Sequence, residues 1–314
     1  MRASLAAGKI ILSFPGRLES IPPCTTAYFI VGGSCTGKCL FCSQSRLSGK
    51  QPGHSRLSRV SWPEIELPVQ EIIRRVNQIS EFRRSCFQCT RKLSLQDLRE
   101  MTEFCRIAIK PVSISASPDC DPEALLALPA VDHLNLSLDC ATERHFSEMK
   151  GGSWDEFWQL LERLARTYPG KIRTHLIAGL GETDQEFLDT MLRLKNIGIG
   201  WGLFSFFPLA GTPLAQRGRI PRKRYRFLQM ASYCLQNNLL NSGDFSLKDD
   251  FICGFKIENQ AIREIAGSGK PFLTSGCSGC NRPFYNESAR EEPYNFHRPL
   301  TEGEIARIIS ELFD

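Results

Sequence analysis

Short apolar runs alternate along most of the chain with segments whose apolar residues recur every three or four positions. The runs predict six buried strands, at residues 27–31, 84–89, 112–117, 134–138, 172–180 and 203–207. The periodic segments predict helices with one apolar face, at residues 67–80, 94–108, 121–128, 154–165, 184–196 and 221–238. Strands that alternate with helices are typical of a parallel sheet with crossover helices. We therefore predict an α/β fold, a (β/α) TIM-type barrel with six or more units.

The alternation loosens towards the C-terminus, where the sequence predicts a short β segment, a helix near 258–266 and a closing helix at 301–312. We divide the chain into a lead-in at residues 1–22, a barrel at 23–242 and a C-terminal extension at 243–314. A chain of 314 residues with 42% hydrophobic and 23% charged content can bury one large core, although two domains are also compatible with it.

Composition narrows the class of protein. The first residues lack an apolar stretch long enough for a signal peptide, and no segment has the roughly 18 consecutive apolar residues of a membrane span. We expect a cytoplasmic enzyme whose 13 cysteines are metal ligands and core thiols rather than disulfides. The net charge of +5 is not accompanied by a groove-reading motif, so we expect no nucleic-acid partner.

Basic residues concentrate in one run, at Arg222, Lys223, Arg224 and Arg226. Such a run is commonly the solvated first turn of a helix. It can also dock an acidic partner, through an attraction that weakens as the salt concentration rises. The sequence leaves both interpretations open.

Candidate chemistry begins with Cys35, Cys39 and Cys42, which are spaced C-x3-C-x2-C in the loop after the first predicted strand. Three thiolates within eight residues can bind three irons of a [4Fe–4S] cluster and leave the fourth iron open. Ferredoxins close that position with a remote fourth cysteine, and structural zinc sites use paired C-x2-C hooks. A chance grouping of core thiols is the alternative. An open iron indicates chemistry on a bound ligand.

Polar residues also stand at the ends of three predicted strands, where the active sites of barrels lie. Asn135, Ser137 and Asp139 alternate, so they should point to one side of their strand. A glycine-rich turn followed by Glu182 ends the fifth strand, and the second carries the sequence SCFQC. Ligand contact is one interpretation of these residues, and ordinary interior hydrogen bonding is the other. His175, taken alone, is typical of a core histidine.

The cysteine loop, including Phe41, resembles the signature of the radical S-adenosylmethionine (SAM) superfamily. The stretch TTAYFIVGGSCTGKCLFC is similar to the lead into the cluster loop of lipoyl synthases, and LNLSLD and AGLGET are similar to strands of biotin synthase. The C-terminal stretch TSGCSGCNRPFYNE resembles a tail of biotin-synthase-like proteins that act in pairs as a split lipoyl synthase. The resemblance covers most of residues 24–287.

This resemblance implies roles for single residues. Phe41 would lie beside the adenine of SAM, and Ser137 and Asp139 would contact its ribose. Gly179 and Glu182 would form a glycine turn on the SAM side of the barrel. SAM would chelate the open iron through its amino and carboxylate groups, and one electron would cleave its C–S bond to give a 5′-deoxyadenosyl radical. The protein would position the reactants and exclude water.

The sequence departs from these families in two places. It lacks the Gly-Gly-Glu segment after the second strand that many members use for the SAM amino group. Biotin synthase carries cysteines on several interior strands for a [2Fe–2S] cluster. Here Cys86 is retained, but the third strand offers only serines and the fifth offers Arg173 and His175. A cluster of the biotin-synthase type would be incomplete.

Cys277 and Cys280, in S-G-C-S-G-C, have the spacing of a metal hook but supply only half of a site. We favour an auxiliary [4Fe–4S] cluster at this hook, with Ser275 as a conceivable oxygen ligand. Further ligands would come, in falling order of preference, from Cys86, Cys24 and Cys89. The alternative is a structural zinc completed by ligands such as Cys86 and Cys89, or by His297.

Together these features predict sulfur insertion into a protein-bound octanoyl chain, one half of lipoyl synthesis, with the auxiliary cluster as the sulfur donor. The expected partners are SAM, an octanoylated carrier such as a lipoyl domain or glycine cleavage H protein, a companion radical SAM half, and a ferredoxin or flavodoxin as electron donor. Within the superfamily, the alternative is biotin synthase or another thiolation of a small molecule. Outside it, the alternative is an iron–sulfur or zinc accessory protein without catalysis, which would release no 5′-deoxyadenosine.

Overall fold

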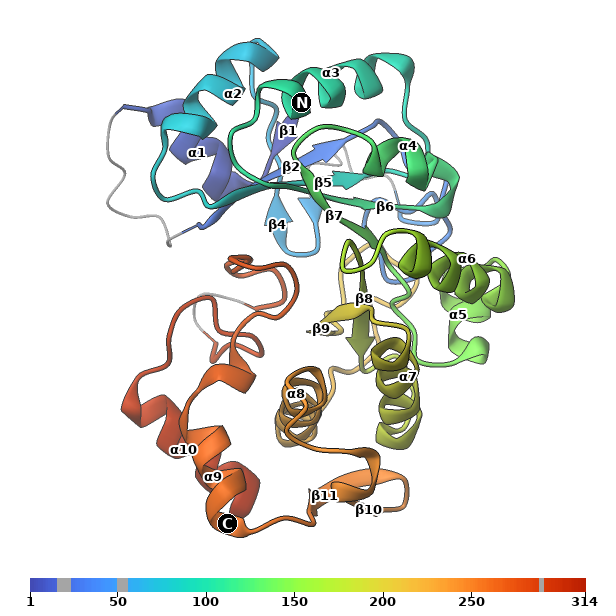
Figure 1. Cartoon of the computed structure of the whole chain (residues 1–314), viewed down its shortest axis with the longest axis vertical. Helices are drawn as coiled ribbons and strands as arrows, with labels where there is room; N and C mark the ends of the chain where they lie inside the picture. The colour runs from blue at the N-terminus through green and yellow to red at the C-terminus, as the bar shows by residue number, and fades with distance from the viewer. Residues whose placement is uncertain (16–23, 50–55, 288–290) are drawn as a thin grey trace.

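The computed structural model describes residues 1–15, 24–49, 56–287 and 291–314. Its centre is a mostly parallel sheet with the strand order β1-β2-β5-β6-β7-β8-β9 (Figure 1). The parallel strands are β2 (Thr26–Val31), β5 (Arg84–Cys89), β6 (Val112–Ala116), β7 (Val131–Leu136), β8 (Ile172–Ala178) and β9 (Gly200–Ser205). This arrangement confirms the predicted α/β barrel type of fold. Among the described strands, β1 and β9 are unpaired edges, so the barrel is a partial one.

Helices connect successive strands and cover the outside of the sheet. They are α2 (Val69–Gln78), α3 (Leu95–Ile107), α4 (Pro122–Leu126), α5 (Glu143–Met149), α6 (Trp154–Thr167), α7 (Asp184–Asn196) and α8 (Arg222–Gln236). Ser94 and Thr183 begin α3 and α7 with capping boxes, which satisfy backbone N–H groups left unpaired at a helix start. Between sheet and helices, the rings of Phe29, Phe87 and Phe104 pack with centroids 5.0–5.6 Å apart.

The N-terminal segment, which we predicted only as a lead-in, contains a short strand and a helix. Ser4 caps helix α1 (Leu5–Ser13), and Ala7 and Ile11 of that helix are fully buried. The preceding strand β1 (Arg2–Ala3) pairs antiparallel with β2 and extends the sheet. The sequence pattern missed β1 because a strand of two residues is too short to show a period.

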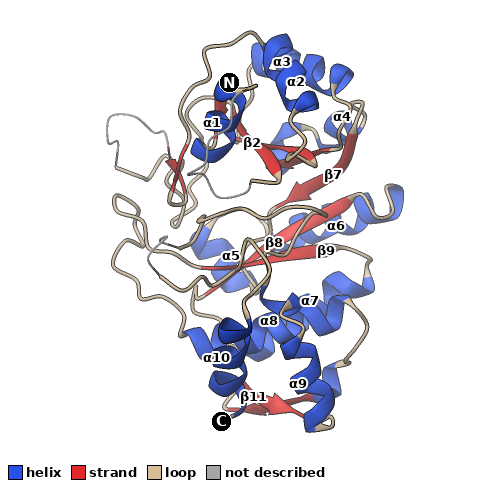
Figure 2. Cartoon of the chain, turned by 90° about the vertical axis from the view of Figure 1, so that its left-hand side faces the viewer, coloured by secondary structure: helices blue, strands red, loops and turns tan. Residues whose placement is uncertain are grey.

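The remaining elements are short or belong to the C-terminal extension. They are β3 (Arg56–Leu57), β4 (Val60–Ser61), β10 (Phe245–Lys248), β11 (Phe251–Phe255), α9 (Asn259–Gly267), α10 (Glu302–Phe313) and the 3-10 helices η1 (Pro118–Cys120), η2 (Ser242–Asp244) and η3 (Lys270–Phe272). Figure 2 shows that α9, α10 and the β10–β11 hairpin lie together at one end of the molecule. Within the described residues, no helix is both long and apolar enough to cross a lipid bilayer.

Strand β7 lies upstream of its predicted position, and this shift shapes the site. It ends at Leu136, so Ser137 and Asp139 belong to the following loop. There Thr174 of β8 inserts its hydroxyl, which accepts the N–H of Leu138 and donates to the carbonyl of Leu136. Asp139 adopts a left-handed backbone conformation with φ of 63°. The polar residues therefore project from a turn at the C-terminal edge of the sheet.

The C-terminal extension returns to the sheet after η3. The hydroxyl of Ser275 accepts the N–H of Leu203 on β9, and Arg84 at the start of β5 donates to the carbonyl of Ser278. Thr25, before β2, donates through its hydroxyl to the carbonyl of Gly279. These contacts span the sheet from β2 to β9, so the extension packs against the inside of the partial barrel.

The structure argues against a dock at the basic run that begins α8, because most of its side chains are buried or paired within the molecule. Arg226 is fully buried and donates to the carbonyls of Pro293 and Tyr294. Arg224 pairs with Asp184 at 2.7 Å, and Arg222 pairs with Glu292 at 3.3 Å. The run therefore attaches the C-terminal extension and α7 to the barrel, and Lys223 alone of the four side chains is exposed.

Candidate functional site

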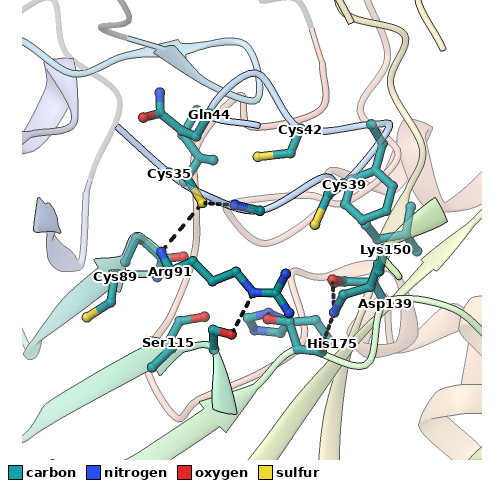
Figure 3. Close-up of a pocket in the computed structure, with 18 of the residues that line it drawn as sticks. Cys35, Cys39, Cys42, Gln44, Cys89, Arg91, Ser115, Asp139, Lys150 and His175 are labelled. Carbon is teal, nitrogen blue, oxygen red and sulfur yellow. Dashed lines mark hydrogen bonds and ion pairs between the residues drawn. The ribbon is translucent and has the colours of Figure 1, made fainter. Parts of the chain in front are cut away.

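A cavity of about 560 Å³ opens at the C-terminal ends of the strands. Its size falls within the range of small-molecule sites, about 300–1,000 Å³. The cysteine loop after β2 forms one wall, and the loops after β5, β6 and β7 form another. Figure 3 shows Cys35, Cys39 and Cys42 facing this cavity, with Asp139 and His175 across from them.

Gly37 sits between two of the loop cysteines. A Cβ added there would lie 3.3 Å from Sγ of Cys35 and 4.0 Å from Sγ of Cys39, so a side chain would crowd both thiols. Sγ of Cys35 accepts the N–H groups of Gly37 and Arg91, at 3.4 and 3.5 Å. N–H donors of this kind stabilise a thiolate ligand.

Burial affects two of the loop thiols, Cys39 and Cys42. Burial raises the pKa of Cys42 to about 12, and the neighbouring Cys39 adds to this effect. Burial likewise raises the pKa of Cys39. In the described part of the chain, no three His, Cys, Asp or Glu side chains are close enough to hold a single metal ion. A cubane cluster has no such requirement, because its cysteines bind different irons.

The residues to which the resemblance gives SAM contacts divide into two groups. Phe41, Ser137 and Asp139 line the cavity. Gly179 and Glu182 are not among its lining residues. Instead a carboxylate oxygen of Glu182 accepts the N–H of Gly179 at 2.6 Å, which closes the turn after β8. Their role towards SAM stays a prediction.

Lys150 and Arg91 line the cavity too, and the sequence patterns did not indicate either. Lys150, which follows α5, forms an ion pair with Asp139 at 2.9 Å. Burial opposes its charge, but Asp139 and Cys39 outweigh burial, so the pKa of Lys150 lies above its usual value. Arg91 follows β5 and pairs with Asp119 at 2.9 Å. Neither could be found from the sequence, because no short motif joins them to the cysteine loop.

His175 is more than a packed core residue. Its Nδ1 lies 3.3 Å from the hydroxyl of Ser137 and its Nε2 lies 3.2 Å from the guanidinium of Arg282. Burial, followed by the charges of Arg282, Arg173 and Lys150, places its pKa well below the usual value. A neutral His175 therefore joins the cavity to the C-terminal extension.

A second group of thiols lies inside the barrel, and it brings together distant parts of the chain. Cys280 lies 3.2 Å from the hydroxyl of Tyr28, and Cys277 accepts from the side-chain amide of Asn135 at 3.7 Å. Burial raises the pKa of Cys86 to about 11, and Cys277 and Cys280 contribute to the rise. Burial also raises the pKa of Cys24 to about 12, with a contribution from Cys280. Of the predicted auxiliary ligands, Cys280 therefore lies within electrostatic range of both Cys24 and Cys86, and Cys277 lies within range of Cys86.

Arg282 connects this thiol group to the cavity, which it also lines. Its guanidinium lies over the ring of Phe204 at 4.7 Å, and its Nε has no hydrogen-bond partner among the described residues. Burial opposes its charge, but Cys280 and Cys86 outweigh burial and raise its pKa. A buried guanidinium needs compensating negative charge, and thiolates bound to a metal would supply it.

The other ligands that the sequence suggested lie elsewhere. Cys89 lines the cavity, and the charge that most affects its thiol after burial is that of Cys120. His297 packs its ring on Phe284 at 4.9 Å. Ser275 uses its hydroxyl to bind the backbone of β9.

A family model of the radical SAM superfamily matches residues 29–194, which is more than half of the chain. The chain belongs to the radical SAM superfamily. Members of this superfamily bind SAM at a [4Fe–4S] cluster. The cysteine loop fits that cluster, because its three thiols share one cavity with Phe41 and two N–H donors point at Cys35.

Two known proteins are similar to this radical SAM chain. The lipoyl synthase of Syntrophotalea carbinolica (strain DSM 2380 / NBRC 103641 / GraBd1) is 26% identical over 193 residues, which cover 59% of this chain and 60% of that one. The chain thus spans about three fifths of the length of this relative. The crystal structure of methylornithine synthase superposes with a TM-score of 0.50 at 13% identity, covering 74% of this chain and 66% of that one. This second likeness concerns the fold alone.

Proposed function

We propose that this radical SAM enzyme inserts sulfur into a protein-bound octanoyl chain, as one component of a split lipoyl synthase. The observation that carries the proposal is the second thiol group. The C-terminal extension brings Cys280 to the hydroxyl of Tyr28 on β2 and Cys277 to the side chain of Asn135 on β7, within electrostatic range of Cys86 and Cys24. Arg282 follows these cysteines and lines the cavity. An auxiliary cluster there would place its sulfide next to a substrate held in the cavity. The similarity to a lipoyl synthase supports the same chemistry.

The cavity offers both polar and apolar groups to its ligands. Asp139, Lys150 and Arg91 are among its polar lining residues. Leu160, Ile177, Phe206 and Leu209 are among its apolar lining residues.

This mixture suits the proposed reactants. The polar residues suit SAM, and the apolar residues suit an acyl chain, because apolar groups gain by leaving water.

The chain's own residues would bind, orient and shield the reactants. When bound, the cluster and SAM supply a radical able to remove hydrogen from an unactivated C–H bond. Lys150 holds Asp139 in its strained turn, where the carboxylate can accept from the SAM ribose. Phe41 would flank the adenine. His175 contacts Ser137 through one ring nitrogen and Arg282 through the other, so it would hold the SAM site and the auxiliary site in a fixed position relative to each other.

The partners follow from this chemistry and are part of the proposal. They are an octanoylated carrier domain, a companion radical SAM half that adds the other sulfur, and an electron donor such as a ferredoxin or flavodoxin. A cytoplasmic location is part of it as well. Because the chain spans only part of the lipoyl synthase that it resembles, these partners are inferred from the site.

The test is the double variant Cys277→Ala, Cys280→Ala, compared with the wild type and with a control double variant Cys234→Ala, Cys253→Ala. Cys234 is buried in α8 and Cys253 is exposed on β11, so the control removes two thiols away from the site. We measure iron, sulfide and zinc for each anaerobically purified chain, 5′-deoxyadenosine, and the mass of the octanoylated carrier.

The proposal predicts about eight irons in the wild type and in the control, and about four in the Cys277/Cys280 variant. That variant should still cleave SAM but should add no sulfur. Unchanged iron with loss of zinc would identify a structural hook and would overturn the proposal. Sulfur incorporation into a small molecule such as dethiobiotin, with none into the carrier, would favour biotin-synthase-type chemistry instead.

A further inference from the structure

The cysteine loop has an outer face as well as the wall it gives to the cavity. Between Glu19 and Glu64 the sequence contains no aspartate or glutamate, although a stretch of this length would hold about five at the average of the chain. The same stretch contains Lys38, Arg46, Lys50, Arg56 and Arg59. All the Lys, Arg, Asp and Glu residues of the segment that holds the cluster cysteines are therefore positively charged ones.

Three of these side chains lie on neighbouring backbone segments. The N–H of Arg46 donates to the carbonyl of Gly37 at 3.0 Å, which places Arg46 beside Lys38. The carbonyl of Arg56 accepts from the side chains of Ser43 and Gln44, at 2.8 and 2.6 Å. We call Lys38, Arg46 and Arg56 the cluster-loop cations. They frame the outer side of the loop that carries Cys39 and Cys42.

The cluster-loop cations are available to a partner. All three are exposed, and none of them lines the cavity. In the part of the chain that the structure describes, no carboxylate forms an ion pair with them. Helix α5 contacts the loop, since the carbonyl of Met149 accepts the N–H of Leu40, and its Glu148 makes no ion pair with Lys38. Arg74 is an exposed cation of the other kind, since it is paired with Glu71.

We propose that the cluster-loop cations form the docking surface for an acidic, low-potential electron-transfer protein that reduces the cluster. Electron transfer between proteins requires the two redox groups to come close, and the cysteine loop is the part of the chain that holds the cluster. A surface of one sign attracts a partner of the opposite sign and speeds their encounter.

The redox step is a single electron transfer. With the cluster and SAM bound, one electron would leave the flavin or iron–sulfur group of the donor, which would be oxidised, and would reduce the cluster. Transfer of this electron to the SAM sulfonium would break the C5′–S bond and give methionine and the 5′-deoxyadenosyl radical. The inference rests on the reductive SAM cleavage within the proposed function, and it does not depend on the octanoyl substrate.

The test uses cluster-loaded enzyme and reduced flavodoxin, an acidic flavin protein, as the probe. The variant is Lys38→Glu, Arg46→Glu, Arg56→Glu. The matched control is Arg106→Glu, Arg166→Glu, Lys171→Glu, which makes the same change of charge at exposed residues near the opposite ends of the strands. We measure the Kd for flavodoxin by titration calorimetry at several salt concentrations, and the rate of 5′-deoxyadenosine release with flavodoxin or with dithionite.

We expect the Kd for flavodoxin to rise about tenfold or more in the cluster-loop variant and to change little in the control. Binding of the wild type should weaken steadily as salt is added. With dithionite, which needs no dock, both variants should cleave SAM at the wild-type rate. A failure of the octanoyl proposal would show in the carrier's mass and would leave these results unchanged.

Three outcomes would overturn the proposal. The first is an unchanged Kd in the cluster-loop variant, and the second is a wild-type Kd that does not respond to salt. The third is a raised KM for the octanoylated carrier under dithionite with normal flavodoxin binding, which would assign the face to the carrier. If the Glu variant does not fold, the Lys38→Gln, Arg46→Gln, Arg56→Gln variant replaces it. The Kd of that variant and the salt series of the wild type are then judged by the same two criteria.

Discussion

The two cysteine groups of this chain are assembled in opposite ways. Cys35, Cys39 and Cys42 lie within one loop, and backbone contacts of that loop, such as the N–H of Arg46 to the carbonyl of Gly37, hold it in shape. Cys277 and Cys280 lie in the C-terminal extension, whereas Cys86 is on β5 and Cys24 precedes β2. The first group is a local motif, and the second exists only when the extension is packed inside the barrel.

The two groups therefore depend on different contacts. A local loop closes at little entropic cost, because its ligands are close in sequence. The auxiliary group depends on long-range contacts from α8, β9 and the start of β5 to the extension. Damage to those contacts should therefore remove the second group and spare the first.

The largest expected effect concerns the local group. Replacing Cys35, Cys39 or Cys42 with alanine should abolish 5′-deoxyadenosine formation and remove about four irons, because we predict these thiols as the ligands of the SAM-binding cluster. Anaerobic iron analysis and product chromatography check this. Cys105→Ala, on the outer helix α3, is the matched control. Normal SAM cleavage in any of the three loop variants would contradict the assignment.

A substitution at Gly202 should act mainly on the auxiliary group. A Cβ at this position would lie 3.2 Å from the carbonyl oxygen of Ser275, 3.2 Å from the ring of His175 and 3.1 Å from the ring of Phe204. Gly202→Val should therefore push the extension off β9, remove about four irons and stop sulfur transfer. SAM cleavage should slow, because His175 also holds Ser137, but it should not stop. Iron content and carrier mass measure this. Gly303→Val, where an added Cβ meets no atom within 4 Å, should leave both unchanged.

Arg226 tests the contact between α8 and the extension. Arg226→Met should lower the free energy of unfolding by about 3 kcal/mol, because the carbonyls of Pro293 and Tyr294 and the carboxylate of Glu292 each lose one cationic partner. Denaturant unfolding measures this change. The exposed neighbour Lys223→Met should change it by less than about 0.5 kcal/mol. Equal effects of the two substitutions would show that the run is a surface patch after all.

The smallest effect concerns the link between the two sites at His175. Its pKa lies well below the ordinary value in the folded protein, whereas the unfolded chain takes up the proton near pH 6.5. The folded state is therefore favoured above pH 6.5 and loses stability as the pH falls, by about 1 kcal/mol for each pH unit. His175→Gln should reduce this loss in unfolding experiments between pH 7.5 and 5.5. The same pH dependence in the variant would place the titrating group elsewhere.

The sequence predicted most elements and part of the site. Helices such as α3 and α7 were found within one residue at each end, since their capping residues and apolar faces are local signals. Strand β7 was predicted too far downstream, because its polar residues Asp132 and His133 interrupt the apolar run. For the run at Arg222–Arg226 the sequence could not choose between a solvated helix turn and a dock, since nothing in the run itself reveals that Arg226 is buried against Pro293 and Tyr294.

The grouping of Cys35, Cys39 and Cys42 follows from the sequence itself, because their spacing keeps them within one loop with Gly37 between them. Only the tertiary structure decided what surrounds them. Lys150 reaches Asp139 because α5 folds back after β7, and Arg282 reaches His175 across 107 positions of sequence because the extension returns to the inner side of the sheet. Local spacing can encode a set of ligands, whereas the charge and shape around that set come from residues that meet only in the folded chain.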